Sequence, residues 1–117
     1  MEKRTLEMAL LLDFYGELLT AKQREHLDLY YNEDFSLGEI ARLGGITPQG
    51  VRDSIRRGEA VLLDTEAKTG LLSRLTQISN RVGKIRSQIA AIEAAVEKES
   101  LSPLFEEIYR ELDHLES

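Results

Sequence analysis

The stretch that decides the fold is FSLGEIARLGGITPQGVRDSIRRG, residues 35–58. Within it, Ser36 and Glu39 form a capping box, which satisfies free backbone N–H groups at the start of a helix. The pattern predicts a short helix over about 37–43. A Gly-Gly pair then ends the helix, because glycine adopts the left-handed conformation of a helix end at little steric cost.

A second helix follows directly. Thr47 is a capping residue, and Pro48 stands at the first helical position, where its missing N–H costs nothing. We expect this helix over 48–62. Two helices joined by a tight glycine turn form a helix-turn-helix, and an ordinary helical hairpin is the alternative. The shared core is predicted to contain Ile40, Ile46 and Val51, with the small residues Ala41 and Gly45 where the two helices approach each other.

The helix over 48–62 is predicted to be amphipathic. At about 100° per residue, Val51, Ile55 and Leu62 share one face, and polar residues occupy the other. In helix-turn-helix proteins such an outer face meets DNA, where arginine bonds guanine and glutamine bonds adenine. Simple solvation of these charges is the alternative. The outward residues are Gln49, Arg52, Asp53 and Arg56; we expect Gln49, Arg52 and Arg56 to read bases, and Thr47 and Arg57 to hold phosphates.

The overall charge weighs against a protein that coats nucleic acid. The chain has 15 basic and 21 acidic side chains, for a net charge of −6, whereas phosphate contacts dominate non-specific binding. Residues 45–58, however, carry three arginines against a single aspartate. This local positive window is what keeps DNA among the candidate partners.

The segments before this stretch also predict helices. Leu6, Leu10, Phe14 and Leu18 recur every four residues, with Met8, Leu11 and Tyr15 beside them, so a first helix is expected over about 3–18. Thr20 and Gln23 form the capping box of the next helix, whose apolar side is expected to be Leu27, Tyr30 and Tyr31. Because no alternating run of strand length occurs, the fold class is all-α.

Residues 71–98 carry apolar side chains at alternating intervals of four and three, which is the heptad spacing of helices that pack on helices. The members of this seam are Leu71, Leu75, Ile78, Val82, Ile85, Ile89, Ile92 and Val96. Basic residues come early in the segment and acidic residues late. An antiparallel pair would join opposite charges, whereas a parallel pair would set Arg81 against Arg86. We therefore expect a homodimer with antiparallel C-terminal helices.

A last helix begins at Ser102 and Pro103, with an apolar stripe formed by Leu104, Phe105, Ile108, Leu112 and Leu115. If it folded straight back, its acidic side would lie beside the acidic end of the long helix, so packing on another subunit is expected. The predicted domains are a helix-turn-helix domain at 1–70 and a helical dimerisation extension at 71–117.

Catalytic and metal-binding patterns are missing from the sequence. There is no cysteine, and His26 and His114 stand far apart without companion ligands, so each is expected at the surface or half-buried. No glycine-rich phosphate loop occurs. We expect no enzyme activity, metal or cofactor. The apolar run near the N-terminus is too short to span a membrane, and a soluble, cytoplasmic protein is expected.

Residues 13–62 carry a family resemblance. The strings DFYGELLT, LYY and SLGEIA resemble the YlxM-like family of bacterial helix-turn-helix proteins, which is similar in turn to region 4 of sigma factors. The resemblance is close over 6–63 and looser beyond. It implies a cytoplasmic protein whose gene commonly accompanies that of the signal recognition particle protein, with a regulatory role through DNA or through the particle.

The resemblance also maps the DNA-facing positions of sigma factors onto Thr47, Gln49, Arg52, Asp53 and Arg56. Two glycines depart from the family pattern. Gly44 stands where the first helix usually carries an apolar core residue, and Gly50 lies inside the second helix, where alanine would be about 1 kcal/mol better. Both departures predict a looser motif.

Two hypotheses of function follow. The first is a dimeric, sequence-specific DNA-binding regulator, with the signal recognition particle operon as a candidate target. The alternative is an interaction protein that binds the protein or the RNA of that particle, because an acidic surface suits a basic partner. A third reading is contact with RNA polymerase in the manner of a sigma domain.

Overall fold

The computed structural model describes residues 3–96 and 101–116 of the chain, and in these ranges every regular element is a helix. The all-α prediction is confirmed. The chain divides into two compact units, Met1–Leu72 and Ser73–Ser117. None of the described helices is long and apolar enough to cross a membrane.

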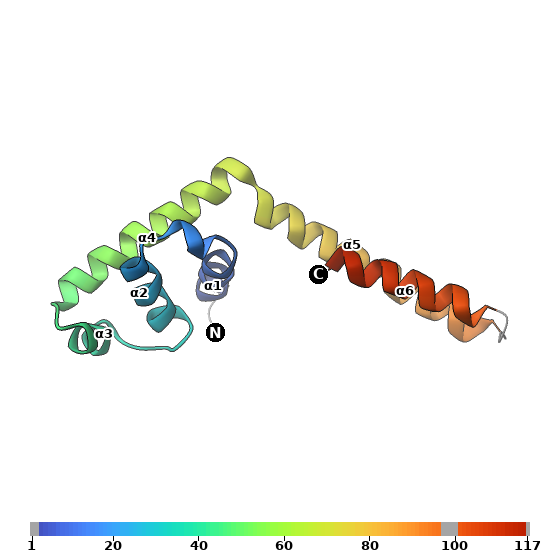
Figure 1. The fold of residues 1–117 in the computed structure, drawn as a ribbon, viewed down its shortest axis with the longest axis horizontal. Coiled ribbons are helices and arrows are strands. Elements are labelled where there is room, and N and C mark those ends of the chain that lie inside the picture. The colour runs from blue at the N-terminus through green and yellow to red at the C-terminus, as the bar shows by residue number, and fades with distance from the viewer. Residues whose placement is uncertain (1–2, 97–100, 117) are drawn as a thin grey trace. The chain divides into compact units, whose positions relative to one another are not determined.

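Between residues 3 and 69, the first unit contains four α-helices and one short 3-10 helix (Figure 1). Their order is α1 (Lys3–Tyr15), the 3-10 helix η1 (Gly16–Leu18), α2 (Ala21–Tyr31), α3 (Leu37–Gly44) and α4 (Pro48–Thr69). The predicted start signals are confirmed. Thr20 and Ser36 each form a complete capping box, with Gln23 and Glu39 respectively. The bonds from the backbone and side chain of Ser36 lower the pKa of the exposed Glu39 carboxyl.

Helix α4 is longer than predicted. It continues past Leu62 to Thr69 and ends at Gly70, whose left-handed φ of 62° forms the cap. The physical reason is that no residue between 62 and 70 stops a helix. Tyr15 of α1 holds the last turns, since its hydroxyl lies 2.6 Å from Glu66 Oε1 and 2.7 Å from Thr69 Oγ1.

The core of the first unit forms where α1, α2 and α3 pack on α4. Leu27, Ile40, Val51 and Leu62 are its most deeply buried side chains. The prediction that Ile46 joins this core is wrong, because its side chain is 41% exposed. Its backbone N–H closes the turn by donating to Ala41 O at 3.1 Å, and this turn geometry directs the side chain outward.

Helix α1 buries a different set of residues from its four-residue repeat. The buried ones are Met8, Leu11, Leu12 and Tyr15, followed by Leu19. The repeat itself, formed by Leu6, Leu10, Phe14 and Leu18, lies on the outer side, with each residue between 40% and 59% exposed. The first helix therefore carries two apolar faces, and only one of them serves the core.

Two contacts set the distance between α2 and α4. Gly58 of α4 lies so close to α2 that a Cβ added to it would be 2.6 Å from Leu27 Cδ1. His26 Nδ1 lies 2.7 Å from Ser54 Oγ. The expectation of a surface or half-buried His26 is wrong, since this hydrogen bond allows the ring to be buried.

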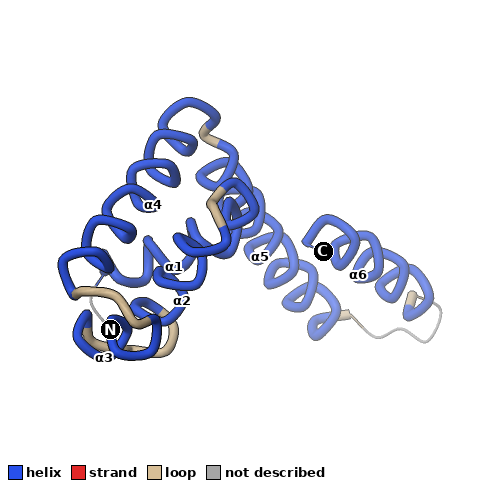
Figure 2. The backbone as a smooth tube through the Cα atoms, turned by 60° about the vertical axis from the view of Figure 1, so that its left-hand side comes forward, coloured by secondary structure: helices blue, strands red, loops and turns tan. Residues whose placement is uncertain are grey.

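The second unit is a helical hairpin (Figure 2). Helix α5 (Leu71–Ala95) begins at the boundary of the units, and α6 (Ser102–Glu116) folds back antiparallel beside it. The predicted end of the long helix at 97–98 lies outside the described residues. Among the residues of the second unit that the structure describes, the buried apolar side chains are Val82, Phe105 and Leu112.

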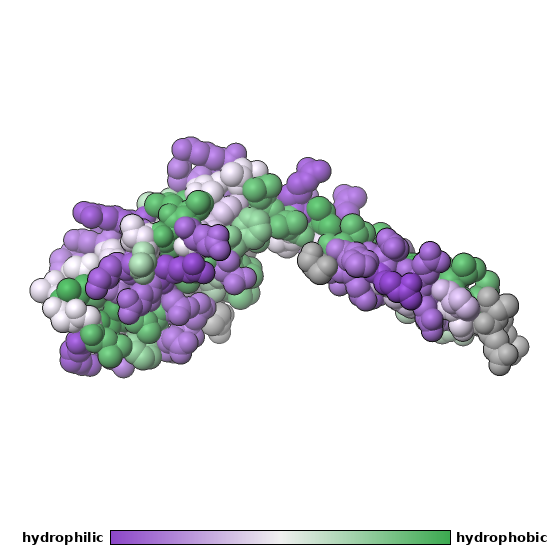
Figure 3. Space-filling model, in the orientation of Figure 1, coloured by the Kyte–Doolittle hydropathy of each residue, from purple (hydrophilic) through white to green (hydrophobic). Residues whose placement is uncertain are grey.

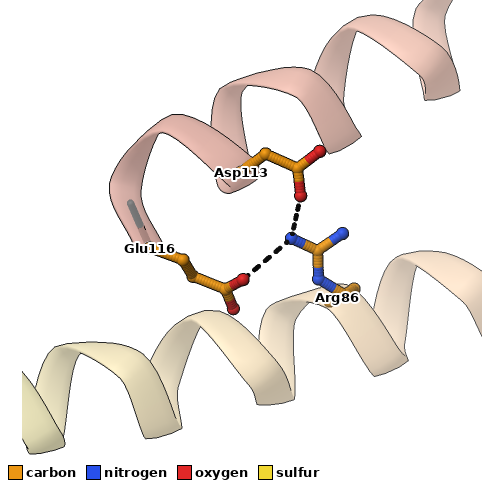
Figure 4. Close-up of polar contacts among 3 residues, drawn as sticks. All are labelled: Arg86, Asp113 and Glu116. Atoms are coloured by element: carbon orange, nitrogen blue, oxygen red, sulfur yellow. Dashed lines mark hydrogen bonds and ion pairs between the residues drawn. The ribbon is translucent and has the colours of Figure 1, made fainter.

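The expectation that α6 packs on another subunit is therefore wrong. Arg86 of α5 supplies the reason: its Nη2 lies 2.8 Å from Asp113 Oδ1 and 3.4 Å from Glu116 Oε2, as Figure 4 shows. Further along the hairpin, Tyr109 donates its hydroxyl to Glu93 at 3.2 Å. A basic residue thus meets the acidic end of α6, and a neutral donor meets the acidic end of α5.

Candidate nucleic-acid interface

Helices α3 and α4 and the three residues between them have the arrangement of a helix-turn-helix. Gly45 turns the chain with φ 65° and ψ 31°, a left-handed conformation that suits glycine because it lacks a Cβ. Thr47 Oγ1 then accepts the Gly50 N–H at 3.0 Å and caps α4. The first turns of α4 are thereby held at the surface.

The six predicted DNA contacts are all exposed. They lie just before α4 and along its first three turns: Thr47, Gln49, Arg52, Asp53, Arg56 and Arg57. The buried Val51 and Ile55 on the opposite side of the helix anchor this face to the core. At about 100° per residue, Arg52 and Arg57 lie on opposite flanks of the face.

Gln49 and Asp53 bond to each other in this structure. Gln49 Nε2 donates to Asp53 Oδ1 at 3.2 Å, one helical turn away. To bond adenine bidentately, glutamine must offer both its amide donor and its carbonyl acceptor. Since the amide nitrogen has two N–H donors, the second one and the carbonyl oxygen stay available to a base while the bond to Asp53 is kept.

The arginines of α4 take no part in the ion pairs formed among the described residues. Between described residues, those pairs join Lys68 to Asp64 and Arg86 to Asp113 and Glu116. The guanidinium groups of Arg52, Arg56 and Arg57 stay open to solvent and to an anion. Guanidinium is suited to such contacts because its planar donors match phosphate and guanine bidentately.

Arg52 and Arg56 border a hollow of about 410 Å³ between α4 and the other helices of the first unit. Glu59 in its wall accepts a hydrogen bond from the Tyr31 hydroxyl, so its carboxylate is already engaged. Tyr30 contributes an exposed ring, which packs edge-on against the Tyr31 ring at 5.0 Å between centroids. Arg52 and Arg56 thus line the same hollow as the exposed Tyr30.

Tyr30 is the candidate residue that sequence reasoning missed. It was expected on the apolar side of α2, yet it is more than one-third exposed while its neighbour Tyr31 is buried. The available signal was the adjacency of the two tyrosines. Neighbouring residues on a helix point about 100° apart, so both rings cannot face one core equally.

Gly50 has a structural role beyond the looseness expected of it. A Cβ added there would lie 3.3 Å from Thr47 Oγ1, the atom that caps the helix. Its absence leaves room for the cap. At Gly44, the last residue of α3, an added Cβ would meet nothing closer than Ile46 Cγ1 at 3.9 Å.

The residues predicted for dimerisation divide into two groups. Val82 is buried and Ile89 is half-buried. The remaining six are exposed: Leu71, Leu75, Ile78, Ile85, Ile92 and Val96. Figure 3 shows apolar side chains at the surface along α5. Within the described residues, a row of large apolar side chains on α5 is thus left exposed.

Comparison with known proteins identifies the family. Residues 1–102 match UPF0122, described as "Putative helix-turn-helix protein, YlxM / p13 like". The chain is 44% identical over 115 residues to a UPF0122 protein of Thermoanaerobacter sp. (strain X514), covering 98% of each chain. It is 51% identical over 90 residues to one of Acetivibrio thermocellus, covering 77% of each chain. It is 40% identical over 113 residues to one of Halalkalibacterium halodurans, covering 97% of each. The chain therefore belongs to the UPF0122 family of YlxM/p13-like proteins.

Proposed function

We propose that this protein is a non-catalytic, DNA-binding transcriptional regulator that reads DNA with the outer face of α4. The observation that carries the proposal is the exposure of Arg52 and Arg56, without ion-pair partners, on the first turns of that helix. The N-terminal residues of a recognition helix are those that reach base edges in the major groove.

In this reading the residues divide by role. Arg52 and Arg56 bond guanine edges, and Gln49 reads adenine. Thr47 holds a phosphate at the start of the helix and Arg57 another from the flank opposite Arg52, and Tyr30 adds a hydroxyl beside the arginines. The acidic remainder of the chain keeps non-specific affinity low, because each phosphate contact must come from these few groups.

A dimer would double this surface. Two α4 helices would meet half-sites about 34 Å apart or a multiple of that spacing. The exposed seam on α5 supports the proposal of a homodimer, because a row of large apolar residues at the surface favours association. The operon of the signal recognition particle is the target that the family resemblance suggests.

The second candidate is an interaction protein of the signal recognition particle pathway that binds the particle's protein or RNA. The net charge of −6 favours the protein as the partner, because an acidic surface attracts a basic protein and repels a nucleic acid. In that case α3 and α4 serve as a scaffold, and a partner protein covers an acidic or apolar surface elsewhere.

A titration separates the two candidates. The purified protein is titrated with its own promoter DNA, with scrambled DNA of equal length and with signal recognition particle RNA, at low and near-physiological salt. Saturable promoter binding that survives the higher salt supports the regulator. Equal affinity for promoter and scrambled DNA, or binding to the RNA alone, refutes it.

A further inference from the structure

The outer side of α1 and of the η1 turn that follows it carries an apolar surface that the core of the first unit does not use. We call it the α1 stripe: Leu6, Leu10, Phe14 and Leu18, each at least 40% exposed. Beside it, α1 and α2 border a hollow of about 670 Å³ that reaches Leu10 and Asp13. Several large apolar side chains in a row next to a concave surface mark a site of protein interaction.

The charges within the segment that carries the α1 stripe have one sign, although Arg24 of α2 lines the hollow beside it. Residues 5–19 contain Glu7, Asp13 and Glu17 and no basic residue. All three carboxylates are exposed. At about 100° per residue Glu7 and Asp13 lie on the same side of α1 as the stripe, and Glu17 directly precedes Leu18 in η1. A helix that docks here needs an apolar row with basic neighbours.

Helix α5 offers such a row. Its exposed seam includes Leu75, Ile78 and Ile85. Residues 71–92 contain four basic residues and no acidic one. Arg74 and Arg81 stand seven residues apart, so they repeat on one side of the helix, next to the exposed Ile78 and Ile85. Both arginines are exposed.

The hairpin weakens the case for pairing α5 with a second α5. That case depended on joining the basic half of one helix to the acidic half of another. Within the chain, however, Glu93 already accepts the Tyr109 hydroxyl, and Arg86 already pairs with Asp113 and Glu116. The early, basic part of α5 keeps an apolar row whose charges are not neutralised.

We infer that the α1 stripe of one copy of this chain binds the exposed, basic seam of α5 from a second copy. Opposite charges then flank two apolar rows. In a symmetric dimer the contact occurs twice, because each copy offers both surfaces. None of the six residues predicted to contact DNA belongs to either surface. The inference rests on the proposed function in that it supplies its dimer, but the contact between the copies can be tested without DNA.

Charge reversal tests the contact. One variant, Glu7→Arg/Asp13→Arg/Glu17→Arg, makes the stripe basic. The other, Arg74→Glu/Arg81→Glu/Lys84→Glu, makes the seam acidic. Dimer dissociation of the full chain is measured by sedimentation equilibrium, and helix content by circular dichroism. We expect a wild-type dimer, and for each variant alone a dissociation constant about tenfold higher or more, because like charges then face each other.

An equimolar mixture of the two variants is the decisive sample. In the mixed dimer the basic stripe meets the acidic seam, and the wild-type stripe meets the wild-type seam, so association should return to the wild-type level. The control is Glu106→Arg/Glu107→Arg/Glu111→Arg on the exposed side of α6, which should leave the dimer intact.

Each other result overturns the inference. A monomeric wild-type chain shows that the two surfaces do not join copies. If the basic-stripe variant dimerises like wild type while the acidic-seam variant does not, α5 pairs with α5. If the mixture stays monomeric, the two surfaces do not meet between chains. None of these results bears on whether α4 reads DNA, which the promoter titration measures separately.

Discussion

Gly58 is predicted to be a position where alanine destabilises a helix. Ordinarily a Gly→Ala change inside a helix stabilises it by about 1 kcal/mol. Here the new Cβ would lie 2.6 Å from Leu27 Cδ1, and Leu27 is 0% exposed, so its side chain has no free space to enter. Overpacking of a core costs about 1–3 kcal/mol. We therefore expect Gly58→Ala to lower the free energy of unfolding by about 1 kcal/mol net.

The assay is urea unfolding followed by near-ultraviolet circular dichroism, in which three of the four tyrosines report on the first unit. Gly38→Ala in α3 is the matched control, since its Cβ would meet nothing closer than Ser36 Oγ at 3.9 Å. In a Leu27→Ala background the clash is gone, and Gly58→Ala should become stabilising. If Gly58→Ala stabilises the otherwise wild-type protein as Gly38→Ala does, the close approach of α2 and α4 is refuted.

Three further predictions concern single groups. Thr47→Ala should cost about 1 kcal/mol of stability in urea unfolding, because the cap on the Gly50 N–H is lost. Folding lowers the pKa of Glu39. The contribution of the Glu39 carboxylate to the free energy of unfolding should therefore be present at neutral pH, and it should disappear as the pH falls through the ordinary pKa of a glutamate and below. The free energies of unfolding of Glu39→Gln and wild type should therefore converge in acid. The pKa of the Tyr109 hydroxyl is raised, mainly because the group is partly removed from water and in addition because the Glu93 carboxylate lies beside it. Glu93→Gln should therefore bring this pKa back towards its ordinary value in a spectrophotometric titration.

Helix starts could be predicted from the sequence because their signals are local. The capping boxes at Thr20 and Ser36 and the cap at Thr47 involve side chains within three residues of the groups they bond. The all-α class, the glycine turn and the exposure of the outer face of α4 followed from the same short-range patterns.

Most of the predictions that were wrong concern contacts between residues far apart in the sequence. A row with four-residue spacing looked like the obvious face of α1, but α1 has a second apolar face, and only the packing on α2 and α4 selects between them. Similarly, acid beside acid argued against folding α6 back, because the position of Arg86 opposite Asp113 depends on the register of the hairpin. His26 is buried because Ser54, which bonds its ring, lies next to it only in the folded chain. Tyr30 is the exception, since its exposure could have been expected from Tyr31, its neighbour in the sequence.

Promoter recognition by the Arg56→Ala variant is the most direct test of whether α4 is a recognition helix. The measurement is the ratio of dissociation constants for scrambled and promoter DNA, compared with that of Arg110→Ala, which removes the same charge from an exposed position on α6. Arg56→Ala should lose about 1–3 kcal/mol at the promoter and little on scrambled DNA, while Arg110→Ala keeps the wild-type ratio. An unchanged ratio in Arg56→Ala, or an equal loss in both variants, would contradict the assignment of α4 as a recognition helix.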